Sequence, residues 1–133
     1  MIVDASAVLA ILKGEPEGLS FAQAIEDADV LRISAATYFE ASIVIDSYRN
    51  PRLSAGFDAF MEIPKLVIEP LTPEQARIAR QAYRDYGKRS GHAANLNFGE
   101  CFSYALARAK REPILFKGEG FVHTDLRSAV SQP

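Results

Sequence analysis

The sequence predicts an α/β fold, namely a three-layer α/β/α sandwich around a short, mostly parallel five-stranded sheet. Short apolar segments alternate along the chain with longer segments of helical periodicity. Helix start signals, such as Thr72-Pro73-Glu74-Gln75, stand just before several of the longer segments. Alternating strands and helices favour right-handed crossovers and a sheet covered on both faces.

The chain begins with a predicted strand, a sharp turn and a helix. Residues 1–3 are apolar and run directly into Asp4, and an apolar helical pattern starts at Ala7. We expect Asp4 at the C-terminal end of the strand, which is the sheet edge where ligands bind in parallel α/β folds. Ser6 is expected to cap the helix. Asp is also a common turn residue, so this position alone leaves both interpretations open.

The remaining elements follow from the same signals of periodicity, capping and breaking residues. They are a helix after Glu15-Pro16, a strand over 30–33, helices over 35–49 and from Pro51 to Pro64, a strand over 65–69, helices from Thr72 to Tyr86 and over 98–110, and a strand over 113–116. Residues 121–125 are expected to close the chain near a fifth short strand.

Composition places the chain among ordinary globular proteins. Its 133 residues are 48% hydrophobic and 24% charged, which predicts a single domain over 1–133. The net charge of −2 argues against a nucleic-acid binder that relies on bulk positive charge. The single cysteine, Cys101, favours a reducing compartment. Without an apolar stretch of membrane-spanning length or a basic leader, we expect a soluble cytoplasmic protein with no membrane partner.

Four carboxylates are predicted to gather at one edge of the sheet. Asp4, Glu40 and Glu119 each follow a strand, and Glu100 opens the helix before the fourth strand. Glu40 stands out because its neighbours at helical spacing predict a core-facing side: Ala36, Thr37, Ile43 and Val44. A buried glutamate is usually paired or bound to a metal. A buried salt bridge remains the alternative for Glu40, and a first-turn acid favoured by the helix dipole remains the alternative for Glu100.

Carboxylates that lie close together repel one another unless a proton or a cation neutralises them. The sequence has no histidine or cysteine ligand pattern, so the oxygen-preferring ions Mg²⁺ or Mn²⁺ fit best. Such an ion bridges carboxylates to phosphate oxygens and activates water. The acids therefore favour hydrolysis of a phosphodiester.

The segments that carry these acids also resemble a known family. They are Met1-Ile-Val-Asp-Ala-Ser-Ala, Arg32-Ile-Ser-Ala-Ala-Thr-Tyr-Phe-Glu-Ala, Leu96-Asn-Phe-Gly-Glu-Cys-Phe-Ser-Tyr-Ala-Leu-Ala and Ile114-Leu-Phe-Lys-Gly-Glu-Gly-Phe. In this order they resemble the PIN-domain ribonucleases, most closely the VapC-type toxins of VapBC toxin–antitoxin pairs. The resemblance implies an α/β/α sandwich, an Mg²⁺- or Mn²⁺-dependent endoribonuclease, a homodimer, and a VapB-type antitoxin whose tail fills the acidic cleft. It assigns metal binding to Asp4, Glu40 and Glu100, with Ser6 as a helper.

Two departures from the family pattern bear on activity. Glu100 stands where the family usually has Asp, and the turn after the fourth strand reads Gly118-Glu119-Gly120 where the family carries one or two Asp. Glu119 is the candidate for a fourth catalytic carboxylate. These departures motivate an alternative function, a catalytically weak PIN domain that binds RNA or an antitoxin. A phosphoacceptor receiver domain is excluded, because the first strand offers one Asp and the third ends in Glu69-Pro70.

Several other polar residues have a plain structural interpretation beside a functional one. The candidates for RNA contact are Arg84, Lys88, Arg89 and Lys117. For the helix face of Arg77, Arg80 and Arg84, a solvated surface with ion pairs to Glu74 and Asp85 is the favoured interpretation. We expect His92 and His123 at the surface or in hydrogen bonds, and Cys101 in the core.

Overall fold

The computed structural model describes residues 1–130 and contains a four-stranded parallel sheet. Its strands are β1 (Ile2–Val3), β2 (Leu31–Ser34), β3 (Leu66–Glu69) and β4 (Ile114–Leu115), in the spatial order β3-β2-β1-β4. All three pairings are parallel. The C-terminal ends of the strands therefore lie along one edge of the sheet, as the alternating pattern predicted.

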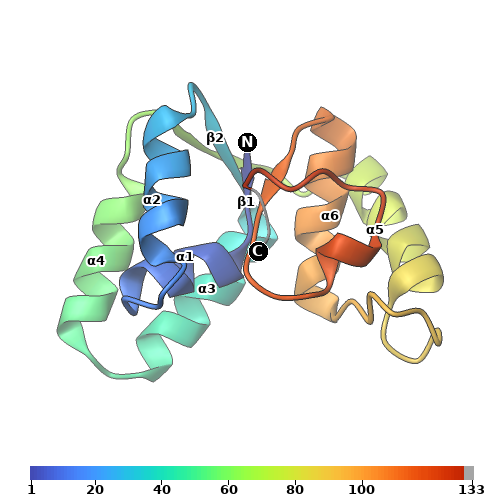
Figure 1. The fold of residues 1–133 in the computed structure, drawn as a ribbon, viewed down its shortest axis with the longest axis horizontal. Coiled ribbons are helices and arrows are strands. Elements are labelled where there is room, and N and C mark those ends of the chain that lie inside the picture. The colour runs from blue at the N-terminus through green and yellow to red at the C-terminus, as the bar shows by residue number, and fades with distance from the viewer. Residues whose placement is uncertain (131–133) are drawn as a thin grey trace.

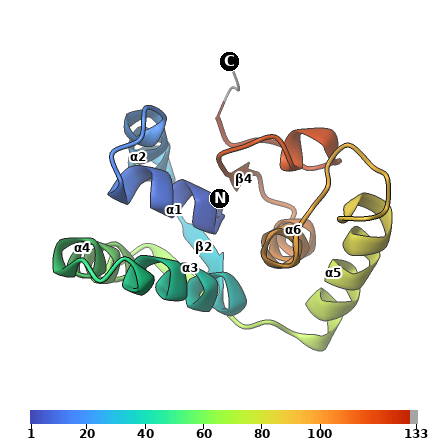
Figure 2. The same cartoon turned by 90° about the horizontal axis from the view of Figure 1, so that it is seen from below.

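Helices cover both faces of this sheet, which confirms the predicted α/β fold class (Figure 1). They are α1 (Ala5–Leu12), α2 (Gly18–Asp27), α3 (Ala35–Ser47), α4 (Pro51–Met61), α5 (Pro73–Tyr86) and α6 (Phe98–Lys110). Helices α1 to α4 lie on one side of the strands, and α5 and α6 lie on the other (Figures 1 and 2). No helix within residues 1–130 has both the length and the apolar character needed to cross a membrane.

The two layers have separate hydrophobic clusters, and the short central strands serve both. Ile2 and Ile114 pack into the cluster with α5 and α6, whereas Val3 and Leu115 pack into the cluster with α1 to α4. Successive side chains of a strand point to opposite faces of a sheet, so two residues suffice to join both clusters. All four of these side chains are completely buried. Hydrophobic packing on both faces of the sheet therefore holds β1 and β4 in place, and with them the sheet edge where Asp4 lies.

The predicted fifth strand is not formed. Residues Phe121–His123 form a short 3₁₀ helix, η1, instead of an extended segment. Phe121 is buried and packs edge-to-face against Phe116, with ring centroids 5.1 Å apart. This packing folds the segment back over the core. Within residues 1–130, Ser128 then returns to the sheet in an isolated parallel bridge to Ile114. Five predicted strands therefore become four.

Candidate active site

Asp4 lies immediately after β1, and its buried carboxylate is fully engaged. Oδ2 accepts hydrogen bonds from the backbone N–H of Ser6 at 3.1 Å and from Ser6 Oγ at 2.6 Å. Asp4 is therefore the N-cap of α1, whereas Ser6 had been predicted for that position. Ser6 has a bridging role instead, because its Oγ also accepts a hydrogen bond from the backbone N–H of Lys117. The turn-residue and site-residue interpretations of Asp4 are compatible.

The other oxygen of Asp4 is held by Ser103, which was not among the predicted site residues. Ser103 Oγ donates to Asp4 Oδ1 at 2.5 Å, and Ser103 lies 3.3 Å from Thr37 Oγ1. Ser103 and Thr37 have no exposed surface, so this polar chain runs through the contact between α6 and α3. Ser103 follows Glu100 by three residues, which places the two on one helix face. That spacing is the signal that could have identified Ser103.

Glu40 lies half-buried at the rim of the site, on the outer half of the α3 face that was predicted to point inward. Thr37 on this face is buried, but Ile43 is 54% exposed. The prediction of a uniformly core-facing side was wrong, because α3 buries the line of Thr37, Ala41 and Ile45. Burial raises the pKa of Glu40, and the negative charges of Asp4 and Glu100 raise it further. The carboxylate lies against Gly99 at the start of α6.

Glu100 takes part in the capping of α6. Asn97 Oδ1 accepts the backbone N–H of Glu100 at 2.8 Å, and Glu100 Oε1 accepts the backbone N–H of Asn97 at 3.0 Å. This is a capping box, so the helix-start interpretation of Glu100 is also correct. Burial raises the pKa of Glu100; the Asn97 N–H opposes this, and the charge of Asp4 adds to it. The Oε2 atom faces Gly120.

The three acids line one cavity of about 310 Å³. Its lining residues are Asp4, Ala5, Ser6, Leu9, Glu40, Val44, Asn97, Glu100 and Lys117. The donor set consists of oxygens and its acids repel one another, which suits a hard divalent cation in chemistry. Within residues 1–130, however, no three Asp, Glu, His or Cys side chains are gathered closely enough to hold a metal ion.

Glu119 is the predicted site residue that the structure leaves outside this cavity. It lies in the exposed turn after β4 and does not line the cavity. Gly120, its neighbour, is the residue of this turn that meets Glu100. The role of Glu119 as a fourth catalytic carboxylate remains a prediction. The sequence did not show which residue of this glycine-flanked turn faces the site.

The basic candidates for RNA contact differ in their surroundings. Lys117 lines the cavity, but its Nζ forms ion pairs with Glu15 and Glu17, which raise the pKa of Lys117. Lys88 is exposed and close enough to Glu100 to favour its charged form. Arg84 and Arg89 are exposed as well. Among the described residues no ion pair joins the α5 arginines to Glu74 or Asp85, although those pairs were predicted.

The predicted structural residues near the site have the expected roles. His92 accepts the backbone N–H of Ala94 at its Nδ1 and packs against Tyr86. Cys101 is buried in the α5–α6 cluster, and burial raises the pKa of its thiol to about 11. The thiol is therefore protonated at neutral pH and is a core residue rather than a nucleophile.

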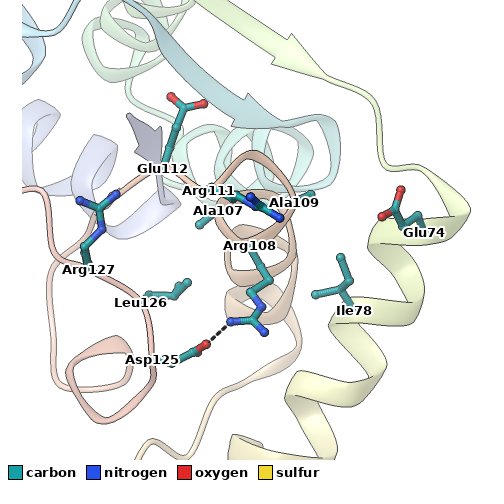
Figure 3. A pocket seen from close by; sticks show the side chains of 10 residues that line it. All are labelled: Glu74, Ile78, Ala107, Arg108, Ala109, Arg111, Glu112, Asp125, Leu126 and Arg127. Carbon is teal, nitrogen blue, oxygen red and sulfur yellow. Dashed lines mark hydrogen bonds and ion pairs between the residues drawn. The ribbon is translucent and has the colours of Figure 1, made fainter.

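A second cavity, of about 610 Å³, lies toward the C-terminal end of α6 and shares no lining residue with the acidic one (Figure 3). Three arginines and three acids line it: Arg108, Arg111, Arg127, Glu74, Glu112 and Asp125. Arg108 is paired with Asp125 (Figure 3). The formal charges of these side chains balance, and basic residues are favoured at the C-terminal end of a helix. This cavity therefore lacks the excess of negative charge found in the acidic cavity.

Comparison with known proteins agrees with these features. The PIN domain family matches residues 1–126. Ribonuclease VapC28 of Mycobacterium tuberculosis is 51% identical over 132 residues, with 99% of both chains covered. Ribonuclease VapC42 of the same organism is 43% identical over 131 residues, covering 98% of this chain and 100% of the relative.

Solved structures show the same fold at low sequence identity. Mycobacterium tuberculosis VapC20, described as a Sarcin-Ricin loop cleaving toxin, superposes with a TM-score of 0.75 at 15% identity, covering 94% of this chain and 95% of its own. A chain of a toxin–antitoxin complex from Klebsiella pneumoniae gives a TM-score of 0.65 at 16% identity, covering 90% and 88%.

Proposed function

This chain belongs to the PIN-domain family, as a VapC-type member, and on this premise we propose that it is a ribonuclease toxin that hydrolyses RNA phosphodiester bonds with Mg²⁺ or Mn²⁺. One observation carries the proposal from the side of the structure. Asp4, Glu40 and Glu100 come from three separate elements and line one cavity at the C-terminal edge of a parallel sheet. Identities of 51% and 43% to two ribonucleases over nearly the whole chain support hydrolysis of RNA as the reaction.

In this proposal Asp4, Glu40 and Glu100 hold the cation. A bound divalent ion would activate a water molecule and stabilise negative charge on the phosphate. Ser6 and Ser103 fix both oxygens of Asp4, so this ligand is preorganised by the fold. Burial and neighbouring carboxylates raise the pKa values of Glu40 and Glu100, and a bound cation would favour their charged forms. Metal binding should therefore weaken as the pH falls toward the raised pKa values of these two acids.

The substrate would approach over the basic residues beside the acidic cavity. Lys88 is the best placed, because it is exposed and its charge reaches Glu100. Arg84 and Arg89 extend this cationic surface along α5 and the following loop. We assign them to the phosphate backbone, which positions RNA without specifying sequence. Lys117 is a weaker candidate, since Glu15 and Glu17 already neutralise it.

A cognate VapB-type antitoxin and a second copy of the chain are the proposed partners. Large exposed apolar side chains are next in sequence to residues that line the acidic cavity, which supports a covering partner there. Phe39 and Ile43 of α3 are 65% and 54% exposed, and Phe98 of α6 is 77% exposed. Exposed apolar groups gathered beside a functional site indicate a protein-binding surface. A tail with a cationic side chain would match the charge of the cavity.

The test is cleavage of bulk RNA by the purified protein with Mg²⁺, with Mn²⁺ and with EDTA, beside an Asp4→Asn variant. We expect cation-dependent cleavage by the wild type and a loss of at least about 100-fold in the variant, since a ligating charge is removed. Asp58→Asn, in α4 and exposed, is the matched control and should cleave normally. Equal cleavage by the wild type and Asp4→Asn, or cleavage undiminished in EDTA, would contradict the proposal.

The second candidate function is a catalytically weak PIN domain that binds RNA or an antitoxin. It is favoured by the capping role of Glu100 and by the lack, within residues 1–130, of three acids gathered for a metal. This candidate predicts RNA or antitoxin binding without cleavage at any concentration of either ion. The same purified protein distinguishes the two, by a gel-shift assay run beside the cleavage assay.

A further inference from the structure

Gly99 lies where a side chain would collide with the Glu40 carboxylate. A Cβ atom built on Gly99 would be 1.8 Å from Glu40 Oε2, 2.4 Å from Cδ and 2.5 Å from Oε1. Non-bonded heavy atoms cannot approach this closely, so the carboxylate occupies the space that any other residue at position 99 would fill. Gly99 is the second residue of α6 and is buried.

Gly120 has the same relation to the second glutamate. Its Cβ would be 2.6 Å from Glu100 Oε2 and 3.3 Å from Leu96 Cδ2. Two glycines from different elements thus leave room for two acids of one cavity.

Backbone conformation does not explain why positions 99 and 120 are glycine. Gly99 is helical, and glycine is less favourable than alanine in a helix. Gly120 has φ −59° and ψ −59°, which any residue adopts. The reason for glycine at both positions therefore lies in what the missing side chains make room for.

We propose that Gly99 and Gly120 are positioning residues of the acidic site, because their missing side chains define where the Glu40 and Glu100 carboxylates lie. This inference rests on the proposed function, in which those carboxylates bind a cation. A methyl group at either position would push the facing carboxylate, the mobile end of a long side chain, out of its place while leaving the backbone unchanged.

The two effects of Gly99→Ala should have opposite signs. Alanine favours the helix, so thermal unfolding in EDTA should occur at the wild-type temperature or above it. Displacement of Glu40 should weaken Mn²⁺ binding, measured by calorimetry, by about 10–100-fold, the range found when the groups that orient metal ligands are removed. Gly120→Ala should weaken Mn²⁺ binding in the same way through Glu100.

Gly56→Ala is the matched control. Gly56 is a helical glycine in α4, and its added Cβ would meet only Leu12 Cδ2, at 3.2 Å. This variant should bind Mn²⁺ as the wild type does. A double-mutant cycle adds a sharper test: in a Glu40→Gln background, Gly99→Ala should cause little further loss, because the group that it displaces no longer contributes a charge.

The outcomes separate this inference from the proposed function. Wild-type Mn²⁺ affinity in both Gly99→Ala and Gly120→Ala would overturn the inference and leave the ribonuclease proposal intact. A loss from Gly99→Ala that is equally large in the Glu40→Gln background would also overturn it. If the wild type shows no Mn²⁺ binding that depends on Asp4, the proposed function fails and the inference fails with it.

Discussion

The Glu40 carboxylate makes the fold less stable at neutral pH than it would otherwise be. Desolvation and the charges of Asp4 and Glu100 raise the pKa of Glu40 above its ordinary value of 4.5. Between 4.5 and the raised value the folded state binds more protons than the unfolded state, so stability falls as the pH rises through this window. Above the window the destabilisation is complete.

Glu40→Gln should therefore be more stable than the wild type at pH 8 in EDTA. The difference in melting temperature should shrink as the pH falls through the window and vanish below about pH 4.5, where Glu40 is protonated in both states. Thermal unfolding across this pH range measures it. Glu26→Gln, at an exposed position of α2, should match the wild type throughout. A variant less stable than the wild type at pH 8 would contradict this account of Glu40.

At the scale of residues, the sequence predicted that three of the four candidate acids lie together, but it did not predict which residues hold them in place. Asp4, Glu40 and Glu100 line one cavity, as the strand order and helix spacing had indicated. Ser103 could not be assigned to Asp4 because the two are 99 positions apart, and their contact depends on how α6 packs on β1. The roles of Gly99 and Gly120 could not be predicted either, since the side chain that fills the space beside a glycine is determined by the packing of distant segments.

At the scale of elements, the start of α6 combines stability and site geometry. Asn97 caps the helix at the backbone N–H of Glu100, and Glu100 caps Asn97 in return. Asn97 also lines the acidic cavity. A change in the cap therefore alters the first turn, in which Gly99 and Glu100 lie.

Asn97→Ala should lower the free energy of unfolding by about 1 kcal/mol, the usual cost of a lost N-cap. It should also reduce RNA cleavage, because the first turn no longer fixes Glu100. Asn50→Ala is the control: Asn50 caps α4 through the backbone N–H of Arg52, away from the cavity. It should cost similar stability in urea denaturation and leave cleavage unchanged. Equal cleavage by the two variants would show that the α6 cap has no part in the site.

Element boundaries were predictable where capping chemistry marks them. The Thr72-Pro73 and Asn50-Pro51 signals correspond to the observed starts of α5 and α4. The prediction of a fifth strand was wrong because the rings of Phe121 and Phe116 pack against each other. A local β pattern in the sequence does not reveal such a contact. The four parallel strands followed from the alternation of short apolar and longer helical segments.

At the scale of the whole molecule, one end of α6 belongs to the acidic site and the other end to a stabilising ion-pair network. Glu100 stands at the site end, and the other end, about 15 Å away by helix rise, joins an ion-pair network. Arg32 of β2 donates to Glu69 of β3 and to Glu112 before β4, both at 2.7 Å. Lys110 at the end of α6 adds a contact of 3.7 Å to Glu69. This network connects two strands and the α6–β4 link, and none of its residues lines the acidic cavity.

Arg32→Met should therefore cost stability but not activity. The Arg32 side chain is 27% exposed, so the loss should fall between that of surface and buried pairs, about 1–3 kcal/mol at pH 7. Cleavage of RNA well below the unfolding temperature should be unchanged. Arg52→Met, exposed and in α4, should change neither property.

Glu112, which is paired with Arg32, should affect stability with a pH dependence opposite to that of Glu40. Desolvation alone would raise the pKa of Glu112, but hydrogen bonds from the Met1 amine and Arg32 lower it below 4.5. Glu112 therefore stabilises the fold above pH 4.5, and this contribution disappears as the pH falls through the lowered value. The stability difference between wild type and Arg32→Met, followed by urea denaturation, should shrink on acidification below pH 4.5. A difference that stays constant or grows there would mean that the Arg32 side chain acts by packing rather than by charge.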